Sequence, residues 1–427
     1  MKPRLKEALK TAVIVLLFLS VVCLALTAAL YSGSTRSGPL DRLASLFSGG
    51  PSQPPRQAQE PTLTDASQPL LISVLGAAGR ASFWGDFDRL DSVFEALGGY
   101  LAEALDTAGA PVEITPAAFR RAVQQAGIYF RYPCDVPMDI LAAWLDADAV
   151  SDLPASQYFL QSGDGGIALY LAGDGGFWQL PTEIDSATFA SVLDDYPADG
   201  TFFALESEDP HYARLDSFSL VDLSTSSMAA AQGANPCDES FMTSTAAALG
   251  FNPYGDSSYQ DDTGNVYTET DCSLRISTDG VLTLRNQGLT TRFAAAGNSD
   301  GERIEYVRSL TEALAAHLMG EGRLMLTGLS RSDGISTVSF DYVLSGLHVE
   351  QVSGPAVTAR FSGSILTELT FRVRTYTCSQ TERLGFLPAA QIAAVLPDDT
   401  LLRLGYADVG DGQLQIGWLR SKAETTS

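Results

Sequence analysis

An uncharged apolar run near the N-terminus constrains this chain more than any other feature. Residues 12–31 read AVIVLLFLSVVCLALTAALY, and as a helix rising about 1.5 Å per residue they match a hydrocarbon core of about 30 Å. Four basic residues precede the run, and the next charge after it is Arg36. The positive-inside rule therefore predicts one transmembrane helix, with residues 1–11 as a cytoplasmic stub and the rest of the chain extracellular.

Two other interpretations of this run are weaker. A cleaved signal peptide has a shorter apolar core of about 7–15 residues and a clear small-x-small cleavage site, whereas here only Thr27-Ala28-Ala29 at the end of a full span resembles one. A lipoprotein signal needs a small residue just before the modified cysteine, but Cys23 follows two valines in the middle of the run. The sequence favours an uncleaved, single-pass anchor in the cell membrane.

The rest of the chain is strongly acidic. The whole sequence of 427 residues has 27 Lys and Arg against 51 Asp and Glu, and residues 32–427 carry 23 basic and 50 acidic residues, a formal charge of −27. No basic cluster follows the membrane run, so nucleic-acid binding is excluded as a function class. The chain is 45% hydrophobic and 18% charged, which is enough apolar material for a packed core.

Composition divides the exterior into three segments. Residues 32–68 are rich in Ser, Gly, Pro and Gln, which predicts a linker. Residues 69–235 form a predicted N-terminal unit and residues 236–427 a predicted C-terminal unit, with the boundary in the polar stretch 224–236. Helical patterns are interspersed with antiparallel strand patterns, which predicts the α+β class: a two-unit ectodomain of mainly antiparallel sheets with packed helices.

Periodicity and turn residues predict the elements. Apolar residues three and four apart indicate a helix over 86–108, and Thr115 followed by Pro116 indicates the start of another. Asp-Gly turns at 163–166 and 173–176 predict a β-meander, with a calcium or phosphate loop as the alternative. Further strands are predicted at 70–76, 127–132, 201–207, 217–223, 266–277, 280–288, 323–330, 335–352, 355–379, 401–409 and 413–420, and further helices at 137–147, 186–196, 238–249, 302–319 and 388–396.

Several common catalytic motifs do not occur in the sequence. It contains no SxxK or Walker pattern and no GxGxxG that opens a helix. His211, His317 and His348 are far apart and give no metal-ligand spacing. For His317, at a helix end, and His348, in a strand, structural roles are predicted. The prediction is a protein that is not an enzyme and has no cofactor or metal site.

The many acids leave one enzymatic alternative open. Any two of Asp194, Asp195, Asp398 and Asp399 could form a glycosidase pair, but the sequence cannot set the separation of roughly 5–10 Å that this chemistry needs. Solvated acids at helix ends and turns are the simpler interpretation. The alternative functions are therefore an extracytoplasmic enzyme acting on cell-wall polymer or peptide, and a ligand-binding sensor domain.

Four cysteines lie in the predicted exterior. They are Cys134, Cys237, Cys272 and Cys378, and no two of them form a CxxC pair, which removes a redox motif and a thiolate metal site. The predicted location permits disulfides. One or two disulfides, or buried free thiols, are both compatible with the sequence.

The layout resembles the YycH/YycI regulatory proteins of Gram-positive bacteria. The resemblance rests on the single anchor, the acidic α+β exterior and the segments GIYFRY…VPMDILAAWL (127–145), FDYVLSGLHV (340–349), AVTARFSGSILTELTFRVRTY (356–376), LPAAQIAAVL (387–396) and LRLGYADVG…QIGWL (402–419). It implies a non-enzymatic regulator that binds and modulates a sensor histidine kinase of a two-component system, and a possible hetero-oligomer with a related regulator.

The predicted membrane helix carries candidate interaction residues. Ser20, Cys23 and Thr27 share one face, and Ala25 with Ala29 gives a small-xxx-small pair on another. Close approach at small residues and hydrogen bonds from Ser or Thr drive helix association in lipid. We therefore expect this helix to contact a membrane sensor kinase or a related membrane protein.

Overall fold

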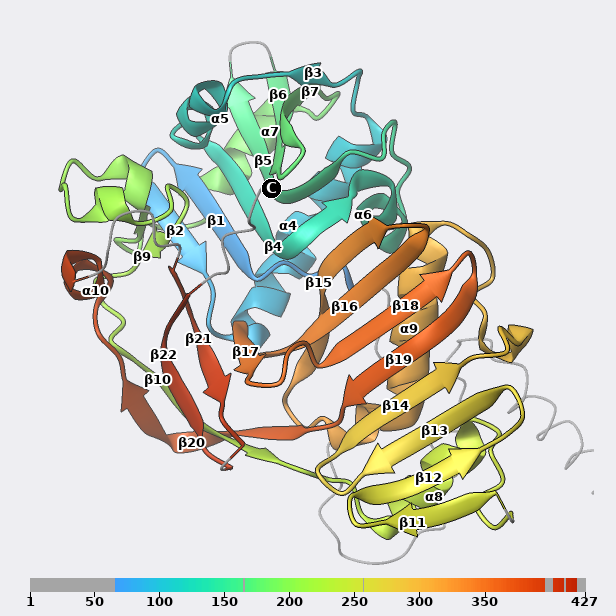
Figure 1. Cartoon of the computed structure of the whole chain (residues 1–427). Helices are drawn as coiled ribbons and strands as arrows, with labels where there is room; N and C mark the ends of the chain where they lie inside the picture. Colours follow the sequence, from blue (N-terminus) through green and yellow to red (C-terminus); the bar gives the residue numbers. More distant parts are fainter. Residues whose placement is uncertain (1–65, 164–165, 256, 396–401, 411, 421–427) are drawn as a thin grey trace, which may run out of the picture. The chain divides into compact units, whose positions relative to one another are not determined.

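The computed structural model describes residues 66–420 apart from 164–165, 256, 396–401 and 411 (Figure 1). The predicted stub, transmembrane helix and most of the linker lie outside the described residues. Within the part that is described, no helix is both long enough and apolar enough to cross a bilayer. Ser67 and Gln68, at the end of the predicted linker, are already buried, and Ser67 accepts a hydrogen bond of 2.9 Å from the Tyr132 hydroxyl.

The first sheet, called the N-terminal sheet, is antiparallel throughout and has the strand order β2-β1-β4-β5-β6-β7-β3. Its strands are β1 (Leu71–Gly76), β2 (Gly79–Phe83), β3 (Val112–Glu113), β4 (Gly127–Pro137), β5 (Pro154–Gly163), β6 (Gly166–Gly173) and β7 (Gly176–Pro181). Its helices are α4 (Phe87–Asp106), α5 (Pro116–Val123), α6 (Met138–Trp144) and α7 (Ser186–Leu193). The predicted meander is confirmed, since β5, β6 and β7 pair in sequence.

Alternation along the strands buries both faces of this sheet. Ile72 and Phe130 belong to the core that includes the apolar stripe of α4, whereas the neighbouring Leu71 and Tyr129 pack with Phe119 of α5. The helix starts follow the sequence, because Asp86 caps α4 and Thr115 accepts a hydrogen bond from Ala118 N before Pro116 begins α5.

The second sheet, called the C-terminal sheet, has the order β11-β12-β13-β14-β19-β18-β16-β17-β21-β22, with β15 also paired to β16. All its pairs are antiparallel except β17 with β21. Its strands are β11 (Ser258–Asp261), β12 (Gly264–Thr268), β13 (Cys272–Ser277), β14 (Val281–Asn286), β15 (Arg323–Ser332), β16 (Ile335–Leu344), β17 (Leu347–Gln351), β18 (Val357–Ser362), β19 (Ile365–Arg372), β21 (Leu402–Asp408) and β22 (Leu414–Arg420). The helices of this region are α8 (Glu239–Ala248), α9 (Asp300–Ala315) and α10 (Ala389–Val395).

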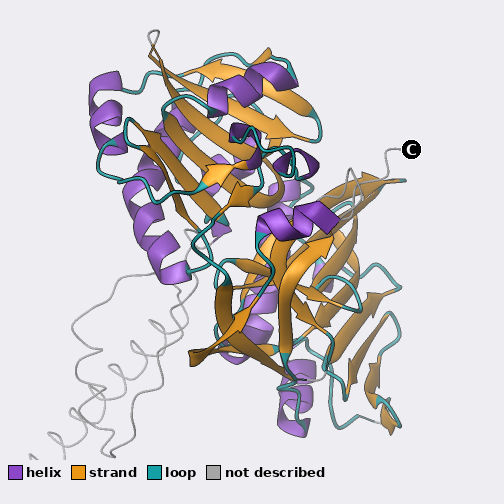
Figure 2. Cartoon of the chain, turned by 90° about the vertical axis from the view of Figure 1, so that its left-hand side faces the viewer, coloured by secondary structure: helices purple, strands orange, loops and turns teal. Residues whose placement is uncertain are grey.

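Two further sheets have two strands each: β8 (Phe202–Phe203) with β9 (Leu220–Val221), and β10 (Ser227–Ala234) with β20 (Thr375–Gly385). Figure 2 shows the helices packed beside broad areas of strand. The mainly antiparallel α+β class is confirmed. Strand β10 lies inside the polar stretch in which we placed the boundary between units.

Several strand predictions are wrong in length. The strands expected over 201–207 and 217–223 are only two residues long each. The first ends at Phe203 because Glu206 folds back to accept hydrogen bonds from Phe203 N and Arg80, and the second pairs only with Phe202 and Phe203. The long run 335–352 is two strands, since Ser345 and Gly346 both take positive φ and form a two-residue hairpin turn. The runs 266–277 and 355–379 are likewise divided by turns.

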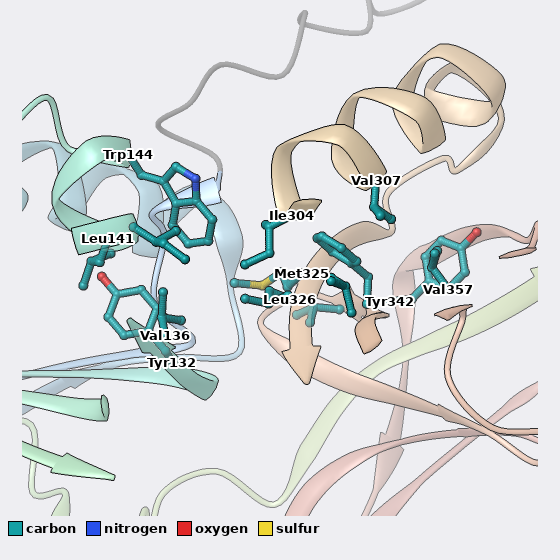
Figure 3. Close-up of a cluster of buried hydrophobic side chains, with 14 of the residues drawn as sticks. Tyr132, Val136, Leu141, Trp144, Ile304, Val307, Met325, Leu326, Tyr342 and Val357 are labelled. Atoms are coloured by element: carbon teal, nitrogen blue, oxygen red, sulfur yellow. The ribbon is translucent and has the colours of Figure 1, made fainter. Parts of the chain in front are cut away.

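Side chains of the two sheets share one buried cluster (Figure 3). Strand β4 lies beside β15, and Trp144 of α6 donates a hydrogen bond of 2.8 Å to Glu305 of α9. Arg323 of β15 makes a two-pronged ion pair with Asp91 of α4 at 2.8 and 3.1 Å. Through these contacts the described residues form a single compact unit.

Candidate functional site: an arginine-lined pocket

A half-enclosed pocket of about 160 Å³ lies between the N-terminal sheet and the parallel pair of the C-terminal sheet. We call it the arginine pocket, because Arg131 of β4 and Arg403 of β21 both line it. Its other walls include Trp84 after β2, His348 of β17 and Trp418 of β22. Segments that are far apart in the sequence therefore build one site.

The backbone ladders fix the two arginines. Arg131 pairs with Leu71 of β1 and accepts a hydrogen bond of 2.7 Å from Leu70 N. Arg403 pairs with Leu419 of β22, and the register of β17 with β21 sets His348 opposite Gly405, two residues beyond Arg403. Each arginine side chain thus extends from a strand whose position is fixed by its pairing with neighbouring strands.

The turn between β16 and β17 brings the two parts of the pocket into contact. Gly346 has a φ of +74°, and a Cβ atom there would lie 2.9 Å from the backbone nitrogen of Gly85. Only glycine allows both this conformation and this approach. The turn therefore brings Leu347 and His348 of β17 to the same pocket as Trp84.

The two arginines have no direct ion-pair partner among the described residues. Among the described residues, neither guanidinium has an ion pair or a hydrogen bond, and the Nε atom of Arg403 is buried without a partner. Burial lowers the pKa of Arg403, and the positive charge of Arg131 lowers it further. The negative charges of Glu350 and Asp341 act in the opposite direction, but the pKa stays below its ordinary value. An electropositive pocket with unused N–H donors suits an anion.

Asp222 is the acid among the residues that line this pocket. Its Oδ1 already accepts hydrogen bonds from the backbone and hydroxyl of Ser224, at 2.8 and 2.6 Å, and from Thr225 N at 3.1 Å. Burial raises the pKa of Asp222, but these hydrogen bonds outweigh burial and leave the pKa below its ordinary value. This carboxylate stabilises its own turn rather than an arginine.

His348 contributes a second buried nitrogen without a partner. Its Nε2 lies 3.1 Å from Oδ2 of Asp341, whereas its Nδ1 is buried and has no hydrogen bond within the described structure. Asp341 also accepts hydrogen bonds of 2.9 Å from Ala356 N and from the Thr327 hydroxyl. Burial raises the pKa of Asp341, yet the bonds from His348, Ala356 and Thr327 together hold it below its ordinary value.

Aromatic side chains form the apolar walls. Trp418 and Phe386 meet edge to face with ring centroids 6.5 Å apart, and the Trp418 indole donates a hydrogen bond of 2.6 Å to Leu387 O. Trp84 comes from the opposite, N-terminal part of the chain. The pocket therefore combines positive charge with flat apolar surface.

A larger groove of about 1110 Å³ lies between α6 and α9, and it bears on the enzymatic alternative. Its lining includes the acids Asp139, Asp152, Asp300, Glu302 and Glu305. Asp300 is paired with Arg303 and Arg331, and Glu305 with Arg308. Hydrogen bonds from Ser299 lower the pKa of Glu302, which is opposite to what a general acid needs. These three acids are therefore engaged in structural interactions.

The structure places the remaining candidate residues as follows. Ser20, Cys23, Ala25, Thr27 and Ala29, together with Asp398 and Asp399, lie outside the described residues. Asp194 and Asp195 are exposed at the end of α7, and His317 is exposed after α9. In the described part of the chain, no three His, Cys, Asp or Glu side chains gather as a metal-binding group.

Cys134, Cys237, Cys272 and Cys378 are free thiols. Burial raises the pKa of Cys237 and of Cys378 to about 11, which keeps both protonated and unreactive near neutral pH. Of the two possibilities that the sequence left open, the structure therefore has free thiols.

Sequence reasoning missed the arginine pocket. It assigned His348 a structural role and did not select Arg131, Arg403 or the tryptophans. The available signal was a single arginine inside each of two apolar strand patterns, GIYFRY and LLRLGYADV, where a charge is costly unless it has a purpose. Comparisons with protein families, curated proteins and solved structures find no match for this chain.

Proposed function

We propose that this chain is a membrane-anchored extracytoplasmic regulatory protein that senses a small anionic ligand in the arginine pocket. Arg131 and Arg403 come from different sheets and have no partner among the described residues, and this is the observation that carries the proposal. Two like charges and a buried N–H without a partner cost stability, and a bound anion would remove that cost. This is the arrangement of a ligand site rather than of a core.

The ligand part of the proposal is tested with the full-length protein in detergent micelles. We expect small acids to be released when the purified wild-type protein is denatured, and mass spectrometry to detect them. Arg131→Met and Arg403→Met should lose the released acid. Arg285→Met is the matched control, because Arg285 is exposed and lies outside the pocket. Equal release from all four proteins, or none from the wild type, would reject the ligand part.

The regulatory part rests on the sequence. The apolar run 12–31 would hold the acidic exterior at the membrane, where it would modulate another membrane protein, which we propose is a sensor histidine kinase of a two-component system. A hetero-oligomer with a related regulator belongs to the same proposal. The ligand state of the pocket would then set the activity of the partner.

The membrane helix provides the test of this part. Replacing Ser20 and Thr27 together by leucine keeps the helix apolar enough to insert, but removes two hydrogen-bonding groups. Crosslinking followed by purification from membranes should recover less partner with this variant. Unchanged recovery and unchanged downstream signalling would show that the helix is only an anchor.

A further inference from the structure

We propose that the ligand of the arginine pocket is a small acid with one flat apolar body: its carboxylate or phosphate group lies between Arg131 and Arg403, and its body lies against Trp84, Phe386 and Trp418. The inference rests on the proposed function and names the class of ligand. It follows from the charges, the walls and the size of the pocket.

The charges define one end of the ligand. The two guanidinium groups are the cations of the lining, and Asp222, the acid of the lining, is engaged by Ser224 and Thr225. Of the acids whose charges act on Arg403, Asp341 is engaged by His348 and Glu350 is exposed to solvent without an ion pair to either arginine. Arginine binds planar carboxylates and phosphates through paired N–H donors. A neutral ligand would leave both guanidinium groups without an ion-pair partner.

The walls and the size define the other end. Between the aromatic rings the surface is completed by leucines, including Leu347 and Leu404. The volume of about 160 Å³ is close to the roughly 150 Å³ of an apolar cavity that holds one benzene ring. A polyphosphate or a sugar would place polar groups against these walls without partners. One ring or a planar chain of similar size fits.

The experiment is calorimetric titration of the full-length protein with five probes: benzoate, phenyl phosphate, acetate, inorganic phosphate and benzyl alcohol. We expect the two ring-bearing acids to bind about tenfold or more tightly than acetate, inorganic phosphate and benzyl alcohol. The benzoate and phenyl phosphate arms decide between a carboxylate and a phosphate ligand.

Variants connect the binding to the pocket. Arg131→Met and Arg403→Met should each weaken benzoate binding about tenfold or more, whereas Arg285→Met should not change it. Trp84→Leu should weaken the ring-bearing probes only, and Trp178→Leu, a change in a half-buried tryptophan of β7 outside the pocket, is its matched control. Changes that follow unfolding are recognised because they would affect all probes equally.

The inference is overturned in three cases. The first case is that acetate or inorganic phosphate binds as tightly as benzoate. The second is that none of the five probes binds. The third is that the acid released from the wild-type protein lacks a flat apolar body. In the first and third cases the pocket still binds an anion in an arginine-dependent manner, so the proposed function would stand. The proposed function itself fails if no acid is released from the wild-type protein, or if the release does not depend on Arg131 and Arg403.

Discussion

The buried Nε–H of Arg403 has no partner among the described residues, so this side chain is expected to weaken the fold. Arg403→Met keeps much of the apolar stem and removes the buried charge. We expect the free energy of unfolding to rise by about 1–2 kcal/mol, as for removal of an unsatisfied buried polar group. Urea unfolding followed by circular dichroism measures it.

The exposed Arg285 is again the control, since Arg285→Met should change the stability by no more than about 0.5 kcal/mol. A loss of stability with Arg403→Met, comparable to that of a truncated core residue, would mean that the guanidinium is structural. A gain in stability together with a loss of ligand is typical of residues that are retained for binding.

Asp341 predicts a specific dependence of stability on pH. Its folded-state pKa lies below the ordinary value, so its contribution to stability is present above about pH 4 and is lost as the pH falls through the lowered pKa. Asp341→Asn should therefore be less stable than the wild type at neutral pH, and the difference should shrink in acid. Urea unfolding at a series of pH values checks this, and a difference that is constant with pH would contradict it.

At the scale of elements, the β16–β17 hairpin positions the pocket through one glycine. Gly346→Ala combines a positive φ with a Cβ atom 2.9 Å from Gly85 N, whereas Gly334→Ala, in the β15–β16 turn, has nearly the same φ of +76° and no neighbour within 4 Å. We expect about 1–2 kcal/mol of destabilisation for Gly334→Ala and at least about 1 kcal/mol more for Gly346→Ala.

Only the Gly346→Ala change should also weaken benzoate binding, because it would push the β16–β17 turn away from Gly85 and so change the shape of the pocket. Thermal unfolding and calorimetry on the two variants measure both effects. Equal destabilisation by the two alanines would show that the approach to Gly85 does not hold the pocket together.

The helices of this fold could be predicted more completely than its strands. The apolar stripe of α4 and the Thr115–Pro116 start of α5 are local signals, and the structure confirms both. Strand β10 could not be predicted, because its stability comes from pairing with β20, about 150 residues away along the chain. A polar sequence such as 224–236 gives no sign of a distant partner.

The arginine pocket could not be predicted for the same physical reason. Arg131 and Arg403 are separated by most of the described chain, and they line one pocket only because β4 and β21 belong to sheets that pack together. Sequence periodicity shows which face of a strand is apolar but not which two strands will meet. Each arginine taken alone marks a charge inside an apolar strand pattern, but it does not show which other strand lies across from it.

At the scale of the whole molecule, the shared cluster predicts that the two sheets unfold together. Ile304 of α9 is fully buried and lies among Trp144, Met325 and Leu326 at this junction (Figure 3). Ile304→Ala should lower the free energy of unfolding by about 2–4 kcal/mol, the usual cost of a truncated core residue.

Two single-tryptophan reporters distinguish joint from separate unfolding. Trp178 on β7 reports on the N-terminal sheet and Trp418 on β22 reports on the C-terminal sheet, with the other tryptophans replaced by phenylalanine. We expect their urea transitions to coincide, and Ile304→Ala to shift both equally. Leu274→Ala is the matched core control, because Leu274 is also fully buried but belongs to β13, near the edge of the C-terminal sheet that is opposite to β22.

If Ile304→Ala shifts only the Trp418 transition, the two sheets are independent units and the junction carries no coupling. Coincident shifts would mean that an acid bound between Arg131 and Arg403 stabilises both sheets at once, because one arginine belongs to each. At a ligand concentration of about 100 times Kd, this stabilisation should reach about 2.7 kcal/mol in the wild-type protein, measured by urea unfolding followed by circular dichroism. Occupancy of a small pocket would then be transmitted across the junction.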